Sequence, residues 1–390
     1  MGLPKAISFL CAATLTAVPW LRPGSGGNAP LDSRFSRAMT PGDSPSEPIH
    51  PCLRFDWAGD FSEGLAPVEV EGRFGFIDTL GTIRIPTGYE FAGEFSCNRG
   101  PALQGGKWGY LDVTGRMIVP AAYDWAGPFR EGLAVVAIDS QYAVIDTNGD
   151  FAGPLRFSDA HGYSGGYAAV RIGEDENAAW GFVDRQGRLA IPPLFNDVPE
   201  GFSEGLAVVR MENERPYRSG YIDSSGGFAI DTLYDAAGPF HEGLAPVGRG
   251  DWRGNRFHGA WGYVDTTGRL VTSLTFAEAG AFQDGKALVR LLSGGGNALI
   301  DRRGRVLKSF RADAELGTGP AGSMVPYKLH DLYGLVDPGN GRCVTAAYAE
   351  AGSLNQGWAR VKLTGGVRGA WAFVAGDGRF LGGVANVAAH

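Results

Sequence analysis

Four glutamates, each followed by glycine in copies of one short phrase, are the first residues in this sequence that could do chemistry. They are Glu63, Glu131, Glu204 and Glu242. If the copies face a common axis, the four carboxylates would form a ring able to bind cations or hydroxyl-rich ligands. Arg99, Gly165 and Gln356 fill the same slot elsewhere, which favours the simpler interpretation that the glutamates are solvent-exposed turn residues.

Aspartates recur with similar regularity at the end of a second phrase, aromatic-Gly-aromatic-aliphatic-Asp-x-x-Gly. They stand at Asp78, Asp112, Asp146, Asp184, Asp223, Asp265, Asp301 and Asp337, and the last copy has Ala375. The carboxylate of such an aspartate can accept backbone N–H bonds two or three residues later, and the glycine can close a hairpin in the left-handed conformation. Because hairpin capping explains the pattern, we expect structural aspartates rather than metal ligands.

Histidine and cysteine show no catalytic or zinc-binding spacing. No two of the six histidines are four residues apart, none lies beside a G-x-S-x-G nucleophile elbow, and no C-x-x-C pair occurs. Cys52, Cys97 and Cys343 follow the N-terminal apolar run. Free thiols are favoured over a Cys52–Cys97 bridge, which stays open. We therefore predict no catalytic residue, no metal and no cofactor.

The segment from Gly248 to Gly259 is the strongest candidate for a binding site. Its sequence, G-R-G-D-W-R-G-N-R-F-H-G, predicts a lengthened loop in which an indole ring flanked by arginines could stack on a sugar or a peptide aromatic, with cation–π support. An exposed loop without a ligand is the alternative interpretation. The binding residues that we predict are Arg249, Trp252, Arg253, Arg256 and His258.

Tandem repeats must position all of these residues. The phrase F-x-E-G-L-A-x-V and its weaker copies start nine times, 34 to 42 residues apart, at Phe61, Phe95, Phe129, Tyr163, Phe202, Phe240, Phe282, Pro320 and Leu354. Each phrase is short, apolar or alternating, and bounded by Gly, Pro or Asp, which is typical of β-strands. The 61 glycines supply the many tight turns that short strands require. Longer connections at 173–179, 211–219 and 248–259 are expected on one face, where repeat arrays often bind partners.

The string from Gly106 to Asp112, G-K-W-G-Y-L-D, followed by Gly115 and by Ile118-Val119-Pro120, resembles the WG-containing repeat of bacterial proteins. The resemblance extends from about Phe55 to the C-terminus, and it implies a bacterial origin and a β-repeat fold but no reaction. In the repeats we expect a large ring in the core, a glycine where backbones approach closely, and a capping aspartate. These structural positions are Trp108, Gly109, Asp112, Trp180, Gly181, Asp184, Trp261, Gly262, Asp265 and Asp78.

The fold class that we predict is all-β, a tandem array of about nine units that forms either a propeller-like ring or an open β-solenoid. The segment from Phe55 to Phe61 matches the phrase that closes a repeat, whereas the last unit ends near Leu381 without it. An N-terminal strand could therefore complete the C-terminal unit. Unequal repeat lengths, and a number of units above the typical four to eight blades, also fit an open stack.

Three regions follow from composition. Residues 1–20, with Lys5 before an apolar run, are a predicted signal peptide; residues 21–50 are a Pro/Gly/Ser linker; residues 51–390 form the repeat domain. We expect export to the periplasm, cell surface or medium, with a cytoplasmic location as the alternative. We also expect no stable membrane span after signal removal. A net charge of −7 argues against nucleic-acid binding.

The function that we expect is a non-catalytic exported scaffold that binds a protein or a glycan through loops on one face. A propeller-type hydrolase acting on carbohydrate or peptide is one alternative, since its catalytic groups could be scattered among distant repeats. A purely structural envelope protein is the other. The sequence names no partner.

Overall fold

The structure is a computed structural model that describes residues 54–153, 156–173, 178–211, 218–254, 256–310, 315–316, 324–329, 331–338, 342–364 and 370–381. The predicted signal peptide, the linker and Cys52 lie outside these residues. All regular elements within them are β-strands, as the sequence predicts. This part of the chain contains no helix long and apolar enough to cross a membrane.

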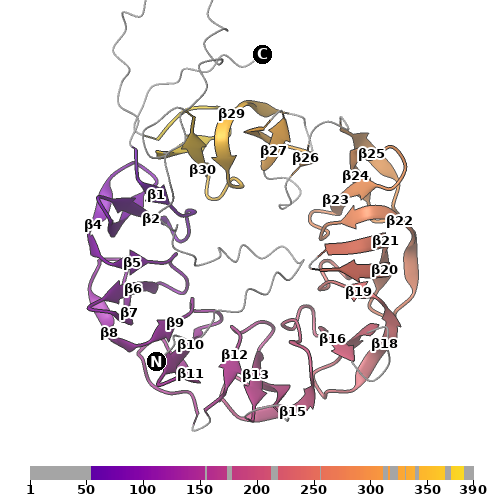
Figure 1. Ribbon diagram of the computed structural model, residues 1–390, viewed down its shortest axis with the longest axis horizontal. Helices are drawn as coiled ribbons and strands as arrows, with labels where there is room; N and C mark the ends of the chain where they lie inside the picture. The colour runs from indigo at the N-terminus through magenta and orange to yellow at the C-terminus, as the bar shows by residue number, and fades with distance from the viewer. Residues whose placement is uncertain are drawn as a thin grey trace, which may run out of the picture.

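The strands form small antiparallel sheets that follow one another around a ring (Figure 1). The second repeat shows the pattern, with the strand order β5-β6-β7-β8. A two-residue strand, β5 (Phe91–Ala92), is followed by a hairpin of β6 (Gly100–Gln104) and β7 (Lys107–Leu111), and then by the longer β8 (Met117–Tyr123). The long strand leads directly into the first strand of the next repeat, so that β9 (Trp125–Ala126) starts two residues after β8.

The other strands occupy equivalent places around the ring. In the first half of the chain they are β1 (Trp57–Ala58), β2 (Leu65–Val70), β3 (Arg73–Asp78), β4 (Ile83–Tyr89), β10 (Leu133–Ile138), β11 (Gln141–Asp146), β12 (Asp159–Ala160), β13 (Ala168–Ile172), β14 (Ala179–Val183) and β15 (Leu189–Phe195). In the second half they are β16 (Ala207–Met211), β17 (Arg218–Ile222), β18 (Phe228–Tyr234), β19 (Ala236–Ala237), β20 (Leu244–Arg253), β21 (Arg256–Asp265), β22 (Leu270–Ala279), β23 (Lys286–Leu291), β24 (Asn297–Asp301), β25 (Val306–Ser309), β26 (Glu315–Leu316), β27 (Val325–Leu329), β28 (Leu332–Val336), β29 (Cys343–Ala351), β30 (Trp358–Leu363) and β31 (Trp371–Ala375).

The Trp-Gly pair marks a bulge between the third and fourth strands of a repeat. Trp108 pairs with Tyr123, and the register shifts before Tyr110; the ladders β14–β15 and β21–β22 repeat this pattern. A Cβ on Gly109 would lie only 2.5 Å from the carbonyl oxygen of Val119, and one on Gly181 only 2.5 Å from that of Ile191. The glycine is therefore required because the backbones approach closely at the bulge, which confirms the prediction.

Hydrophobic cores lie between successive repeats rather than within one. Tyr110 and Val119 of the second repeat, for example, pack against Phe129 and Val136 of the third. Repeats that cannot bury their own apolar face stabilise each other in this way.

The tryptophans of the repeated phrase share a position in the sheet but differ in burial. Trp180 is buried in a core cluster, as expected. Trp108 and Trp261 are only partly buried and pack against the clusters from outside. The expectation of equally buried rings is therefore wrong for two of the three.

The two ends of the chain pair with each other and close the ring. The Phe55 N–H donates to the Trp371 carbonyl at 2.9 Å, and the Trp371 N–H donates back at 2.8 Å. This bridge occupies the place of the Trp108–Tyr123 pair, so Phe55 takes the position that the last residue of the long strand has in the second repeat. Phe61 also packs on Phe373 with ring centroids 4.7 Å apart. The chain thus adopts the predicted ring rather than the open solenoid, and Figure 1 shows β1 beside β30.

Candidate functional site

The F-x-E-G phrase forms a two-residue turn between the first and second strands. Glu63 and Gly64 have φ values of 52° and 83°, as a type I′ turn requires at both central positions. In the second repeat the turn residues are Cys97 and Asn98, with φ of 54° and 58°. The slot assigned to Arg99 therefore belongs to Cys97; the weak copy lacks Glu-Gly, and its alignment was shifted by two residues.

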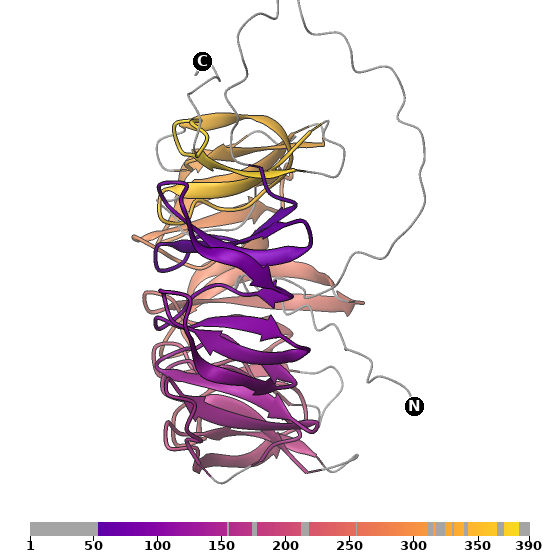
Figure 2. The same cartoon turned by 90° about the vertical axis from the view of Figure 1, so that its left-hand side faces the viewer.

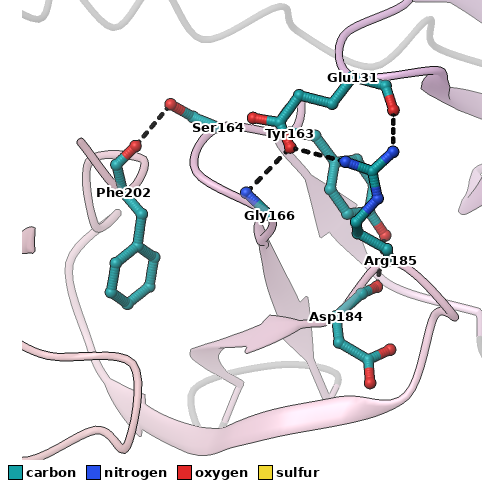
Figure 3. Close-up of polar contacts among 7 residues, drawn as sticks. All are labelled: Glu131, Tyr163, Ser164, Gly166, Asp184, Arg185 and Phe202. Atoms are coloured by element: carbon teal, nitrogen blue, oxygen red, sulfur yellow. Dashed lines mark hydrogen bonds and ion pairs between the residues drawn. The ribbon is translucent and has the colours of Figure 1, made fainter. Parts of the chain in front are cut away.

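The turn glutamates bind the next turn around the ring instead of forming an open carboxylate site. Glu131 accepts a hydrogen bond of 2.9 Å from the Gly166 N–H, and Arg185 lies beside the same carboxylate (Figure 3). Glu204 accepts two backbone N–H bonds, from Glu242 at 2.6 Å and from Gly243 at 2.7 Å. These contacts link separate turns in series. The hypothesis of a ligand-binding glutamate ring is therefore corrected, and the glutamates are more than solvated turn residues.

Serine and glutamine continue the same series of links. The Ser164 hydroxyl donates to the Phe202 carbonyl of the next repeat at 2.7 Å (Figure 3), and Ser62 donates to Phe95 in the same manner. Gln356 accepts from the Gly64 N–H at 2.8 Å across the junction of the last and first repeats. We call this set of contacts the turn belt; it supports the closed ring.

The repeated aspartates cap hairpins, as predicted. Asp112 Oδ1 accepts N–H bonds from Thr114 at 2.9 Å and from Arg116 at 3.0 Å. The hydroxyl of Thr114 and these backbone N–H groups hold the pKa of Asp112 below its ordinary value. Asp184 and Asp265 make the equivalent bonds two and four residues on, and Asp78 adds an ion pair with Arg84 at 2.6 Å.

Within the described residues, no group of three or more His, Cys, Asp and Glu side chains could hold a metal ion. His161 is an aromatic partner of Trp180, with ring centroids 5.2 Å apart and planes at 90°; burial lowers the pKa of its imidazole. Cys97 and Cys343 are free thiols. A shallow open depression beside Glu63 and Leu80 includes Asp78, whose carboxylate is already bound to Arg84.

Two carboxyl groups with raised pKa values meet an arginine where the ring closes. Arg360 Nε and Asp60 Oδ1 form an ion pair at 2.9 Å. Glu94 accepts a bond from the Asp60 backbone N–H at 3.1 Å. Burial raises the pKa of both carboxyl groups; Arg360 opposes this at Asp60, and Asp60 adds to it at Glu94. Asp60 contacts Arg360 across the junction of the chain's ends, and Glu94 binds the backbone of Asp60 at that junction.

The segment predicted to be a loop at 248–259 is instead the end of a long hairpin, so that prediction is wrong. Strands β20 and β21 pair without interruption from Leu244–Asp265 to Arg253–Arg256. In the second repeat the corresponding ladder ends at Gln104–Lys107, which is equivalent to Arg249–Ala260. The hairpin of the sixth repeat is therefore four residue pairs longer, or about 13 Å at 3.3–3.4 Å per residue. It projects beyond its neighbours on one side of the ring (Figure 2).

The pairing divides the predicted binding residues between two faces of the hairpin. Trp252 is directly opposite Phe257, and their rings are 5.4 Å apart. Because side chains alternate along a strand, Arg249, Arg253, Arg256 and His258 lie on the other face. The prediction that these arginines flank the indole is therefore wrong. The cation near the Trp252 ring is Arg210 of the preceding repeat, at 5.3 Å.

The aromatic face of the hairpin is fastened to the ring. The Trp252 indole N–H donates to the Asp235 carbonyl at 2.9 Å, and Asp235 Oδ2 accepts from the Gly250 N–H at 2.9 Å. A Cβ on Gly248 would lie 2.7 Å from the Phe257 ring, so this ring rests on bare backbone. The sequence did not predict a role for Asp235 or Phe257. For Asp235 the signal was the repeated Tyr-Asp phrase, because Asp124 in the third repeat likewise accepts a backbone N–H bond, from Asp139.

The opposite face is charged and exposed. Arg249, Asp251, Arg253, Arg256 and His258 are all exposed to solvent. Arg256 Nη2 lies 3.5 Å from Glu278 Oε1, a carboxylate shared with Arg290 at 3.3 Å. We call this set of residues on β20 and β21 the arginine face.

The other two lengthened connections lie at equivalent hairpin tips. The connection at 173–179 joins β13 to β14, and that at 211–219 joins β16 to β17, although residues 174–177 and 212–217 are outside the described residues. Because the repeats share one orientation, the described strand ends at these three connections lie on one side of the ring. We call this side the tip face.

A family model for the WG-containing repeat matches residues 49–73, 74–108, 108–142, 142–174, 180–214, 220–251 and 261–292. The chain belongs to the WG-containing repeat family. These matches extend over seven of the repeats of this WG-repeat ring, and the structure adds the degenerate copies beyond them. No curated protein matches the sequence.

Several solved structures are weakly similar to the ring. A eukaryotic initiation factor has a TM-score of 0.40 and 13% identity, with 87% of this chain and 88% of that chain covered. The tricorn protease has a TM-score of 0.39 and 11% identity, with 83% and 43% covered. Apo AztD from Citrobacter koseri has a TM-score of 0.36 and 14% identity, with 73% and 94% covered. Similarity at this level assigns no function.

Proposed function

We propose that this WG-repeat ring is a non-catalytic scaffold that binds another protein through its tip face. The observation that carries the proposal is the β20–β21 hairpin, which extends four residue pairs beyond the equivalent tip of the second repeat. The fold does not need this extension, because the second repeat packs into the ring with the short tip. An extension that is bonded to the preceding repeat, exposed and charged is what a recognition element requires.

Binding is favoured over catalysis by how the acidic side chains are used. The turn glutamates bind backbone N–H groups, the repeated aspartates cap hairpins, and Asp60 and Glu94 lie at the ring closure. A hydrolase needs at least two acidic or nucleophilic groups that converge in a cleft open to substrate. These carboxylates have structural partners instead, so we propose recognition by surface complementarity.

Export is part of the proposal and rests on residues 1–20, where one lysine precedes an apolar run of about the length of a signal-peptide core. The test is N-terminal sequencing of the mature protein from fractionated cells of its own host. Cleavage near residue 20 and recovery outside the cytoplasm are expected. An intact N-terminus in the cytoplasmic fraction would remove export from the account.

The binding role is tested by shortening the hairpin. Residues 250–259 are replaced by Asn-Gly, which joins Arg249 to Ala260 with the two-residue turn that such a pair accepts and gives the sixth repeat the tip length of the second. Cross-linking in the native host, followed by mass spectrometry, should recover partners with the full-length chain and lose them with the shortened one. Equal recovery from both, at equal melting temperature, would refute the proposal.

A further inference from the structure

The outer edge of β21 is unpaired along the projecting part of the hairpin. The ladder between β21 and β22 begins only at Trp261, opposite Phe276. In the described residues no strand pairs with 256–260 on that side. The other long edge of the hairpin is different, since Asp235 covers it through the Gly250 N–H and the Trp252 indole.

Register shows which backbone groups this edge presents. In a hairpin with a two-residue turn, the two residues that flank the turn form both backbone N–H···O=C hydrogen bonds with each other; here they are Arg253 and Arg256. Along the ladder, such pairs alternate with pairs whose N–H and C=O groups point away from the partner strand. The outward pairs are Trp252–Phe257 and Gly250–Gly259, which agrees with the bond from the Gly250 N–H to Asp235. Phe257 and Gly259 therefore offer two N–H and two C=O groups at the free edge of β21.

The side chains beside this edge are mostly basic, and Asp251, opposite His258, is the acidic one. Arg256 and His258 are on β21 itself, and Arg253 is directly opposite Arg256. Arg249 is opposite Ala260. Arg249 and Arg253 are four residues apart, or about 13 Å along an extended strand. Acidic residues with the same spacing on an added strand would match them.

We propose that the free edge of β21 binds an extended acidic segment of a partner protein by strand addition, with its carboxylates on the arginine face. Main-chain hydrogen bonds to Phe257 and Gly259 would supply the pairing, and charge complementarity would select the acidic segment. Glu278, which already contacts Arg256, shows that a carboxylate is accommodated beside this strand. The inference rests on the proposed binding role of the tip face and names the chemistry of its partner.

Two alternative roles for this edge lead to different binding behaviour. Arginines on an exposed edge can serve only to prevent pairing with other chains, in which case no peptide binds. An anionic glycan would use the arginines but not the edge amides. The glycan is less favoured because the ring of Trp252, which would stack on a sugar, is already placed between Phe257 and Arg210.

The test uses a fluorescent nine-residue peptide of alternating Glu and Thr, titrated with the full chain at low salt. Two further peptides carry N-methyl groups on the backbone amides of alternate residues, one peptide at the odd positions and the other at the even positions. Galacturonate oligomers are the probe for glycan binding. Binding by the unmodified peptide, with at least tenfold loss for one methylated set and little for the other, is expected. No binding, equal binding by both methylated peptides, or tighter binding of galacturonate would overturn the proposal.

Protein variants complete the design. Arg253→Glu with Arg256→Glu should weaken peptide binding at least tenfold, whereas Arg73→Glu with Arg116→Glu, which changes the net charge equally at exposed sites elsewhere, should leave it within threefold. Equal losses in both would mean that net charge alone attracts the peptide, and would overturn the proposal. If the peptide fails but the shortened hairpin still loses partners in cells, strand addition is wrong and the binding role stands.

Discussion

Gly181 shows how one residue type is fixed by backbone geometry. The bulge between β14 and β15 brings the Ile191 carbonyl so close that a methyl group at residue 181 would lie 2.5 Å from it. Gly88, in contrast, has no atom within 4 Å of the place where a methyl group would be added, although it is also in a strand, β4. The two glycines therefore differ in what substitution costs.

Gly181→Ala should lower the free energy of unfolding by about 1–3 kcal/mol, as overpacking in a close-packed site does. Gly88→Ala should change it by less than about 0.5 kcal/mol, the usual range for surface substitutions. Urea denaturation of both variants measures the difference. Equal midpoints for the two variants would show that the close approach at the bulge does not constrain residue 181.

Burial separates the tryptophans in the same manner. Trp180→Ala should cost about 3–5 kcal/mol, the range for buried aromatic residues, because its ring is 4% exposed within a core cluster. Trp108→Ala should cost less, since its ring packs on the cluster from outside. Denaturation midpoints of the two variants give the order, and a greater loss at Trp108 would contradict the packing described for these repeats.

At this scale the sequence predicts what is local. The capping aspartates were predictable because Asp112 binds N–H groups two and four residues away. The partner of Glu204 was not, because Gly243 is 39 residues away and belongs to another repeat. Cys97 was misaligned for a related reason: its turn lacks Glu-Gly, and positive φ at Cys97 and Asn98 leaves little trace in residue type.

At the scale of elements, the turn belt joins segments that have no bond along the chain. Glu204 is the strongest single link, with two short bonds to the turn of the next repeat. Charge-assisted bonds of this kind contribute more than neutral ones, but the side chain is exposed, which reduces the gain.

Glu204→Ala should therefore destabilise the chain by about 1 kcal/mol, the typical net value of a hydrogen bond. Asp150→Ala is the control, since the hydrogen bonds of that residue use its backbone: its carbonyl accepts from the Asp146 N–H and its N–H donates to Asp146 Oδ1. Thermal melting at low and high salt measures both. A Glu204 variant as stable as the control would mean that the turn belt carries no stability.

The hairpin of the sixth repeat was predicted as a loop because glycine at 248, 250, 254 and 259 suggests turns. Those at 248 and 259 instead make room for the Phe257 ring. Once the strands are paired, alternation alone separates Trp252 from the arginines. The residue composition was enough to identify the segment as a candidate. The pairing register of β20 and β21, which depends on contacts between the strands, determines which side chains lie together.

For the whole molecule, ring and open stack could not be distinguished from sequence, since closure depends on the small rotation between repeats summed around the array. The end phrases were informative nonetheless: the segment from Phe55 to Phe61 completes the last repeat, as its similarity to closing phrases suggested. The site was less predictable than the fold, because its residues come from β16, β20, β21, β22 and the single residue between β18 and β19.

Closure should depend on pH through Glu94. The pKa of Glu94 is raised in the folded chain. Just above the ordinary carboxyl pKa, Glu94 therefore keeps its proton in the folded chain but has lost it in the unfolded chain. The free energy of unfolding consequently falls as pH rises through this range. Glu94→Gln, which keeps an acceptor for the Asp60 N–H, should melt like the native chain near pH 4 and at a higher temperature near pH 7. A difference that stays constant between these pH values would contradict this account.

The central claim, a ring closed by its own ends, is tested most directly by amide hydrogen exchange at Phe55 and Trp371. Their N–H groups bond to each other's carbonyls at 2.9 and 2.8 Å, so both should exchange as slowly as the amides of the internal Trp108–Tyr123 pair, and removal of 370–381 should release Phe55. Fast exchange at Phe55 and Trp371, while the internal pair stays protected, would show an open stack and contradict the ring.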